Sequence, residues 1–174
     1  KNYKILIIFM SDNGYFHGEH GLADKWYPYQ KSIKVPLIVH DPRLSENRRN
    51  IINDEFILNI DIAPSILAST GLTVPQRMQG VDFSDLYLEE KPVDWRKDFF
   101  YEHPYVTNEE RIPSSEALVT HSEKYILWPH YDFEEFFDLV KDPFEVSNAI
   151  NDRSSVRNVE SMKKRFLELK ENAK

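Results

Sequence analysis

The chain has 174 residues, of which 41% are hydrophobic and 13% aromatic, so it can build a core and is not intrinsically disordered. Its 22 Lys and Arg against 29 Asp and Glu leave a net charge of −7, which disfavours nucleic acid or an anionic membrane as the main partner. No apolar run approaches the roughly 18 residues of a membrane-spanning helix. Cysteine is absent, which excludes disulfides, thiolate metal sites and a cysteine nucleophile. A start at lysine rather than methionine predicts a processed or excised piece.

The first half of the chain carries strand and helix patterns with a long gap between the strands. Residues 5–10 form a continuous apolar run, typical of a strand buried on both faces of a parallel sheet. Residues 15–34 lack periodicity and predict a long functional loop. Residues 35–40 predict a second strand. Residues 59–70 predict a helix, with Asp61 as its N-cap and Gly71 as the glycine that ends it.

The second half has the pattern of a small antiparallel sheet followed by a helix. Residues 73–94 are irregular, and we place a domain boundary there, between residues 1–93 and 94–174. Four short strands are expected at 98–102, 116–120, 124–128 and 135–139. Residues 154–172 predict a helix with one apolar stripe, capped by Asp152 or Ser154.

A candidate cation site follows the first strand, where the sequence reads Ser-Asp-Asn-Gly. Ligands of open α/β sheets bind beyond the carboxyl ends of the strands. Asp12 and Asn13 offer adjacent hard oxygen donors, which suit Ca²⁺ or Mg²⁺. The same four residues also make a plain turn, so this motif alone leaves both interpretations open.

The following loop favours the cation site over the plain turn. Residues 17–25 read HGEHGLADK, and residues 35–38 read VPLI. Together with the Ser-Asp-Asn-Gly turn, these segments resemble the sulfatase family of the alkaline phosphatase superfamily. Weaker similarity extends over residues 59–82 and 124–145, so the resemblance covers nearly the whole chain.

The resemblance implies roles for individual residues. Asp12 and Asn13 would be two ligands of a divalent cation, Ca²⁺ in the first place and Mg²⁺ as the other option. Lys25 would bind a sulfate oxygen, and His20 would bind sulfate or protonate the leaving group. A cation and an ammonium aimed at those oxygens would stabilise the charge that develops when a sulfate ester is cleaved.

Other polar side chains have competing interpretations. His17 and His20 could form a zinc site, but two imidazoles are an incomplete ligand set. Glu19 and Asp24 are expected to fix the loop. His103 is a candidate substrate contact, because the smaller subdomain of sulfatases is thought to help choose the substrate; a surface histidine is the alternative.

The family's nucleophile is a formylglycine made from Cys or Ser in a Cys/Ser-x-Pro-Ser-Arg motif, and the chain has no such motif. We therefore expect the C-terminal part of a sulfatase-like α/β sandwich, followed by a small antiparallel sheet with a packed C-terminal helix. The formylglycine would lie in a missing N-terminal part, and the isolated chain should have no turnover.

The sequence thus predicts a fragment of a metal-dependent sulfatase acting on sulfated carbohydrates or small molecules, periplasmic or extracellular in its bacterial parent. A phosphodiesterase or phosphonate monoester hydrolase of the same superfamily is one alternative. A non-catalytic sulfatase-like interaction domain is another. The first strand lacks parallel neighbours in this chain, so a dimer through an exposed sheet edge is also expected.

Overall fold

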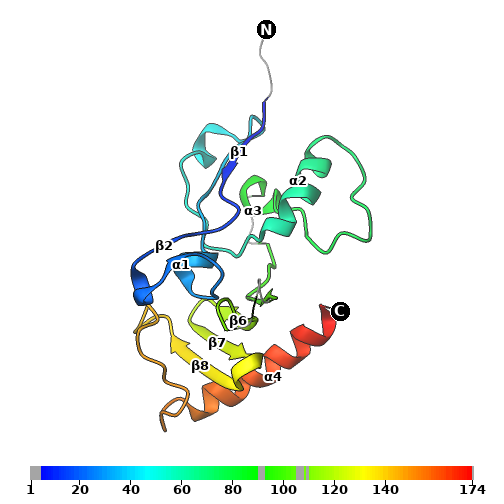
Figure 1. Cartoon of the computed structure of the whole chain (residues 1–174). Helices are drawn as coiled ribbons and strands as arrows, with labels where there is room; N and C mark the ends of the chain where they lie inside the picture. The colour runs from blue at the N-terminus through cyan, green and yellow to red at the C-terminus, as the bar shows by residue number, and fades with distance from the viewer. Residues whose placement is uncertain (1–4, 90–92, 105–107, 109, 174) are drawn as a thin grey trace. The chain divides into compact units, whose positions relative to one another are not determined.

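The structure is a computed structural model that describes residues 5–89, 93–104, 108 and 110–173. The chain divides into two compact units (Figure 1). One unit comprises Lys1–Asp12 and Pro36–Lys97, and the other comprises Asn13–Val35 and Asp98–Lys174. The domain boundary expected near residue 93 remains a prediction.

The first unit contains a two-stranded sheet. Strand β1 (Ile7–Met10) pairs with β4 (Leu37–His40), and the pairing is antiparallel. Successive residues of β1 point to opposite faces, and on one face Ile7 and Phe9 are 54% and 61% exposed. The expectation of a parallel strand buried on both faces is therefore wrong for the part of the chain that the structure describes.

Helix α2 (Ile62–Ser69) is the longest helix described in this unit, and the 3₁₀ turn η3 (Asn59–Asp61) leads into it. This confirms the predicted helix, and Gly71 ends it with a left-handed φ of 75°, as expected. The short elements η2 (Glu46–Arg48) and α3 (Asp85–Leu88) complete the unit.

Asp61 does not cap α2 with its side chain. It is fully buried, accepts hydrogen bonds from the backbone N–H groups of Leu58 and Val81, and forms an ion pair with Arg96. A buried carboxylate requires such partners, and they come from 3, 20 and 35 positions away along the chain. Asp61 is thus the N-cap residue of α2, as predicted, but its carboxylate is taken by these partners and makes no capping hydrogen bond to the helix.

The second unit is built on a four-stranded antiparallel sheet in the order β5-β6-β7-β8. The strands are β5 (Asp98–His103), β6 (Ser115–Thr120), β7 (Glu123–Trp128) and β8 (Phe133–Asp138). All four predicted strands are confirmed within a few residues. The 3₁₀ turn η4 (Pro129–Tyr131) connects β7 to β8.

Helix α4 (Val156–Asn172) covers one face of this sheet (Figure 1). The predicted apolar stripe is confirmed: Val159, Met162 and Phe166 are buried, and the Phe166 ring lies 5.2 Å from that of Tyr125. The N-cap residue is Ser155, so both predicted caps, Asp152 and Ser154, are wrong. None of the helices described is long and apolar enough to cross a membrane.

The opposite face of the sheet carries residues 13–35. This segment contains β2 (Phe16–His17), η1 (Glu19–Gly21), β3 (Ala23–Asp24) and α1 (Gln30–Ile33), so the prediction of one irregular loop is wrong in detail. Tyr27 and Tyr29 pack on the buried sheet residues of this face, which are Ala117, Ile126, Trp128 and Phe137. The sheet is therefore covered on both faces, by α4 and by the segment that carries the predicted site.

Candidate active site

Two of the predicted site residues meet at the start of the second unit. The Nζ atom of Lys25 donates a hydrogen bond to Oδ1 of Asn13 at 2.9 Å. The amide nitrogen of Asn13 donates to the carbonyl of Gly14 at 2.7 Å, so the amide oxygen is the atom that faces the ammonium. The amide oxygen of Asn13 and the ammonium of Lys25, 12 positions apart in the sequence, are thus in direct contact.

Gly14 fixes the backbone beside Asn13 by close approach. Its N–H donates to the carbonyl of Ser32 at 2.7 Å. A Cβ atom on Gly14 would lie 2.0 Å from the carbonyl oxygen of Lys31, a distance that no side chain tolerates. The glycine is required here because the backbone of helix α1 passes so near at Lys31, and not because of a left-handed φ.

Trp26 connects Lys25 with the third candidate, His103. The Lys25 ammonium lies 4.9 Å from the centre of the Trp26 ring, and the His103 ring meets Trp26 edge-on at 5.7 Å. Among the described residues, Nδ1 of His103 is buried without a hydrogen-bond partner. Burial also lowers the pKa of His103, which favours the neutral imidazole. Such a group is ready to exchange a hydrogen bond with a ligand.

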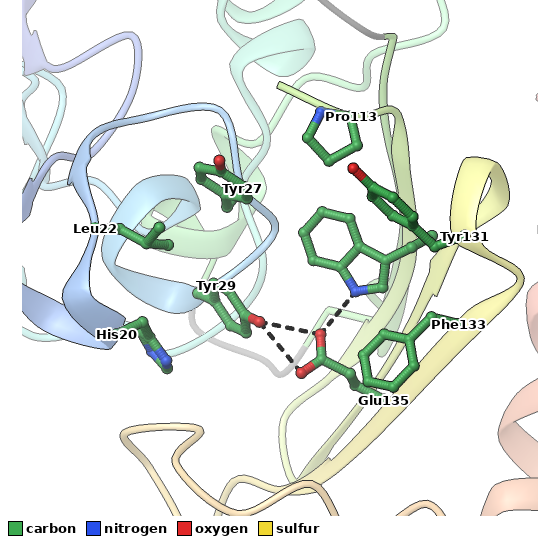
Figure 2. Close-up of a pocket in the computed structure, with 9 residues that line it drawn as sticks. His20, Leu22, Tyr27, Tyr29, Pro113, Tyr131, Phe133 and Glu135 are labelled. Atoms are coloured by element: carbon green, nitrogen blue, oxygen red, sulfur yellow. Dashed lines mark hydrogen bonds between the residues drawn. The ribbon is translucent and has the colours of Figure 1, made fainter. Parts of the chain in front are cut away.

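His20 lies elsewhere, in an aromatic cavity of about 350 Å³ (Figure 2). Its ring stacks on Tyr29 at 4.2 Å with an interplanar angle of 12°. The rest of the cavity wall is mainly aromatic: Tyr27, Trp128, Tyr131 and Phe133, with Leu22 and Pro113.

Among the described residues that line this cavity, Glu135 is the only acidic one. It accepts hydrogen bonds from Tyr29 Oη at 3.0 Å and from Trp128 Nε1 at 2.7 Å, which Figure 2 draws as dashed lines. Burial raises the pKa of Glu135, and the two donors and His20 oppose that shift only in part. The His20 imidazole therefore faces aromatic rings and a carboxyl group.

Asp12 closes the first unit and Asn13 opens the second. The backbone carbonyl of Asp12 accepts a hydrogen bond from Asn59 Nδ2 at 2.8 Å. The described residues contain no group of three or more His, Cys, Asp or Glu that could hold a metal ion. Since Ca²⁺ takes about six to eight oxygen ligands, Asp12 and Asn13 can supply only part of a coordination shell.

Glu19 holds the loop itself. Glu19 accepts the backbone N–H of His17 at 2.7 Å, and its carboxylate lies 3.4 Å from the Lys31 amine. The backbone hydrogen bond from His17 is the main reason that the pKa of Glu19 is lowered. The predicted role of Glu19 as a loop-fixing residue agrees with these contacts.

Sequence reasoning missed the ion pair beneath the loop. Lys124 is fully buried and Glu145 is 3% exposed, and the two pair with each other. One signal was available: Lys124 stands at the same strand parity as Ile126 and Trp128, where an apolar residue is expected.

Comparison with known proteins identifies the family. The model of the family described as "N-sulphoglucosamine sulphohydrolase, C-terminal" matches residues 18–172. The chain belongs to the sulfatase family. An arylsulfatase of Clostridium perfringens is 29% identical to this sulfatase chain over 160 residues, which are 91% of this chain and 32% of that protein. An N-acetylglucosamine-6-O-sulfatase of Bacteroides thetaiotaomicron is 30% identical over 146 residues, covering 82% of this chain and 26% of that protein.

A solved structure extends the likeness to the fold. The protein BT4656, solved in complex with its substrate D-glucosamine-2-N,6-O-disulfate, superimposes with a TM-score of 0.88 at 27% identity and covers 95% of this chain. The match confirms the predicted sulfatase-type α/β fold with its antiparallel sheet and terminal helix. The sulfatase chain spans about one third of the length of the relatives it matches (32% and 34%).

Proposed function

We propose that the protein carrying this chain hydrolyses sulfate esters of carbohydrates, and that Lys25 binds a sulfate oxygen. The observation that supports this is the 2.9 Å contact between Lys25 Nζ and Asn13 Oδ1. Hydrolysis of a sulfate ester places negative charge on the sulfate oxygens and on the leaving oxygen. A fixed ammonium lowers the free energy of that charge in the transition state. The relatives that are named sulfatases support the same reaction.

Asp12 and Asn13 are proposed to hold a divalent cation, Ca²⁺ or alternatively Mg²⁺. Their donor atoms are a carboxylate and an amide oxygen, the types that these hard cations prefer. When bound, the cation would supply Lewis-acid stabilisation of sulfate oxygens. The formylglycine nucleophile and the other ligands would come from outside this chain, which has no Cys and, among its described residues, no group of three or more His, Cys, Asp or Glu suited to a metal ion.

His103 is proposed as a substrate contact. Its buried Nδ1 lacks a partner among the described residues, and Trp26 packs between it and the Lys25 ammonium. A hydroxyl or amine of a sugar next to the bound sulfate group would satisfy this nitrogen. His20 is proposed to protonate the leaving alcohol, although its ring contacts are with Phe16 and Tyr29.

The reaction is tested with the full-length protein. Sulfate release from D-glucosamine-2-N,6-O-disulfate is measured before and after removal of divalent cations with a chelator, and again after separate additions of Ca²⁺ and Mg²⁺. We expect sulfate release, its loss with the chelator, and its recovery with Ca²⁺. A phosphonate monoester assayed in parallel addresses the related chemistry: faster turnover of that ester than of any sulfate ester would contradict the proposal.

Self-association and export are further proposals for the parent protein. β1 and β4 form a sheet of only two described strands, and Ile7, Phe9 and Ile38 are each more than half exposed. A dimer through this sheet would cover them. Light scattering tests the dimer, and a monomeric mass would contradict it. Cell fractionation tests the proposed periplasmic or extracellular location.

A further inference from the structure

The face of the sheet under residues 13–35 holds two charged residues, Lys124 and Glu135, among mainly apolar neighbours. In β7, Lys124 has the same parity as Ile126 and Trp128, which pack against Tyr27 and Tyr29. In β8, Glu135 has the same parity as Phe137. The residues of opposite parity, including Tyr125 and Phe136, pack against α4. The α4 face carries charges too, but these lie partly exposed and pair with the helix itself: Glu134 with Lys163 and Glu116 with Lys170. Lys124 and Glu135 differ because they lie where the sheet meets the segment that carries Lys25.

The buried ion pair of Lys124 and Glu145 forms hydrogen bonds to that segment on both sides of Tyr29. Nζ of Lys124 donates to the carbonyl of Pro28 at 2.9 Å and pairs with Glu145. The second oxygen of Glu145 accepts the backbone N–H of Gln30 at 2.7 Å. Tyr29 itself donates its hydroxyl to Glu135. Three successive residues of the segment are therefore bound by three charged side chains from or just after the sheet.

Stability alone does not explain this arrangement. Burying an ion pair costs desolvation, and apolar residues of similar volume are often equally or more stabilising in such places. Burial lowers the pKa of Lys124, which reflects this cost. Glu145 also has a left-handed φ of 57°, a strained conformation for a residue other than glycine. What the pair provides is a fixed backbone position, because Lys124 donates to one defined backbone atom and Glu145 accepts from another.

Residues 28–30, which these side chains bind, are close in sequence to Lys25, the proposed sulfate-binding residue. Pro28 follows Lys25 by three residues, with Trp26 in contact with the Lys25 ammonium between them. On the far side, the Gly14 N–H is bonded to Ser32, just after Gln30. A shift of residues 28–30 would therefore be transmitted to Lys25 at one end and to the backbone beside Asn13 at the other.

We propose that Lys124 and Glu145 are positioning residues, which hold Pro28–Gln30 on the sheet and thereby place the Lys25 amine at Asn13. This inference rests on the proposed function, since it assigns them a part in sulfate ester hydrolysis through Lys25. Neither residue touches the substrate. A displacement of about 1 Å in a catalytic group can cost about a hundredfold in rate, so a small loosening would be visible in turnover.

The test separates positioning from stability with three variants of the full-length protein. Lys124→Met leaves Glu145 buried and unpaired, whereas the double variant Lys124→Met/Glu145→Met removes both charges and keeps the volume. Phe166→Leu is the control, because it weakens the α4 face of the same sheet and leaves the ion pair intact. For each protein we measure thermal stability, kcat and KM, at a temperature where all are folded.

The expected result is a double variant about as stable as the wild type, whose kcat is still about 10- to 100-fold lower. Phe166→Leu should lose stability and keep the wild-type kcat. A purely structural role makes the opposite prediction, in which kcat recovers along with stability. Wild-type kcat in the double variant would overturn the proposal.

A second measurement, which does not depend on enzyme activity, tests the positioning of Lys25 separately from the proposed function. Reductive methylation of Lys25, quantified by peptide mass spectrometry, reports whether its amine is held by Asn13. We expect several-fold faster methylation of Lys25 in the double variant than in the wild type or Phe166→Leu. Unchanged methylation would contradict positioning even if sulfate is released. Faster methylation without any sulfatase activity in the wild type would refute only the proposed function.

Discussion

At the residue scale, Asn13 is oriented by its neighbours before any ligand binds. Its amide nitrogen bonds to the Gly14 carbonyl, and its oxygen accepts from Lys25. The Gly14 backbone is in turn bonded to Ser32. The position of the oxygen therefore depends on a glycine that has no side chain to contribute, because the space beside it is filled by the backbone at Lys31.

Replacing this glycine should disturb the site. In Gly14→Ala the new Cβ would lie 2.0 Å from the Lys31 carbonyl oxygen, so the two backbone segments must separate. We expect a loss of about 1–3 kcal/mol in unfolding free energy, measured by urea denaturation. The control is Gly21→Ala, where nothing lies within 4 Å and only the left-handed φ of 69° is strained. A loss no greater than that of the control would contradict this account.

His103 should make stability depend on pH. Burial lowers its pKa in the folded state below the value in the unfolded chain. Its contribution is therefore fully present above the unfolded pKa of about 6.5 and is lost as the pH falls through the folded pKa. Substitution His103→Gln should reduce the fall in unfolding free energy between about pH 7.5 and pH 5. An identical fall in both proteins would show that His103 titrates normally.

At the scale of the elements, the sheet of the second unit separates two tasks. One face packs α4 through Leu118, Tyr125 and Phe136. The other face supports the segment with Lys25, partly through charged groups. Because successive residues of a strand point to opposite faces, stability and site geometry can be altered separately in the same strands.

Truncation in the α4 interface tests the first task. Phe166 is 3% exposed and its ring contacts those of Phe100 and Tyr125. We expect Phe166→Ala to lower the unfolding free energy by about 3–5 kcal/mol. Leu167→Ala on the same helix, 62% exposed, should change it by about 0.5 kcal/mol or less. Equal effects of the two substitutions would mean that α4 does not dock as described.

The elements with local signals were predictable, and those with distant partners were not. The stripe of α4 and the alternation in β5 to β8 are patterns within single segments, and both predictions are confirmed. Asp61 had the sequence environment of a helix cap, but Arg96 claims its carboxylate from 35 positions away. No sequence pattern near Asp61 predicts that Arg96 is its partner.

The candidate site was predictable in the same uneven way. Asp12, Asn13 and Lys25 were found because their motif resembles the sulfatase family, and the structure brings the last two into contact. The pair Lys124–Glu145 was missed, because the strand parity of Lys124 indicates only that a charge is buried, and nothing in the sequence identifies its partner 21 positions away. The placement of His20 in an aromatic cavity also depends on packing across the sheet.

At the scale of the whole molecule, the chain matches about one third of its relatives' length. The described residues supply the Lys25 ammonium, the oxygen donors of Asp12 and Asn13, and His103 near that ammonium, but no grouped metal ligands and no cysteine. We propose that these groups bind and neutralise an anion. The proposed formylglycine nucleophile would come from outside these residues.

The chain of 174 residues alone should therefore be inactive. We expect no sulfate release from an aryl sulfate above the level of a Lys25→Ala control of the same length. The measurement is sulfate detection by ion chromatography after prolonged incubation with Ca²⁺. Turnover that depends on Lys25 would mean that a nucleophile lies within these residues.

The central claim is that the Lys25 amine beside Asn13 binds the sulfate group, and steady-state kinetics of the full-length Lys25→Ala protein test it most directly. Removing one such group from a site of developing charge typically lowers the rate by about 10²- to 10³-fold, and we predict a loss of this size in kcat/KM for D-glucosamine-2-N,6-O-disulfate. Lys34→Ala, at an exposed lysine of the same segment, should leave the rate unchanged. If the Lys25→Ala protein releases sulfate as fast as the Lys34→Ala protein, the claim is contradicted.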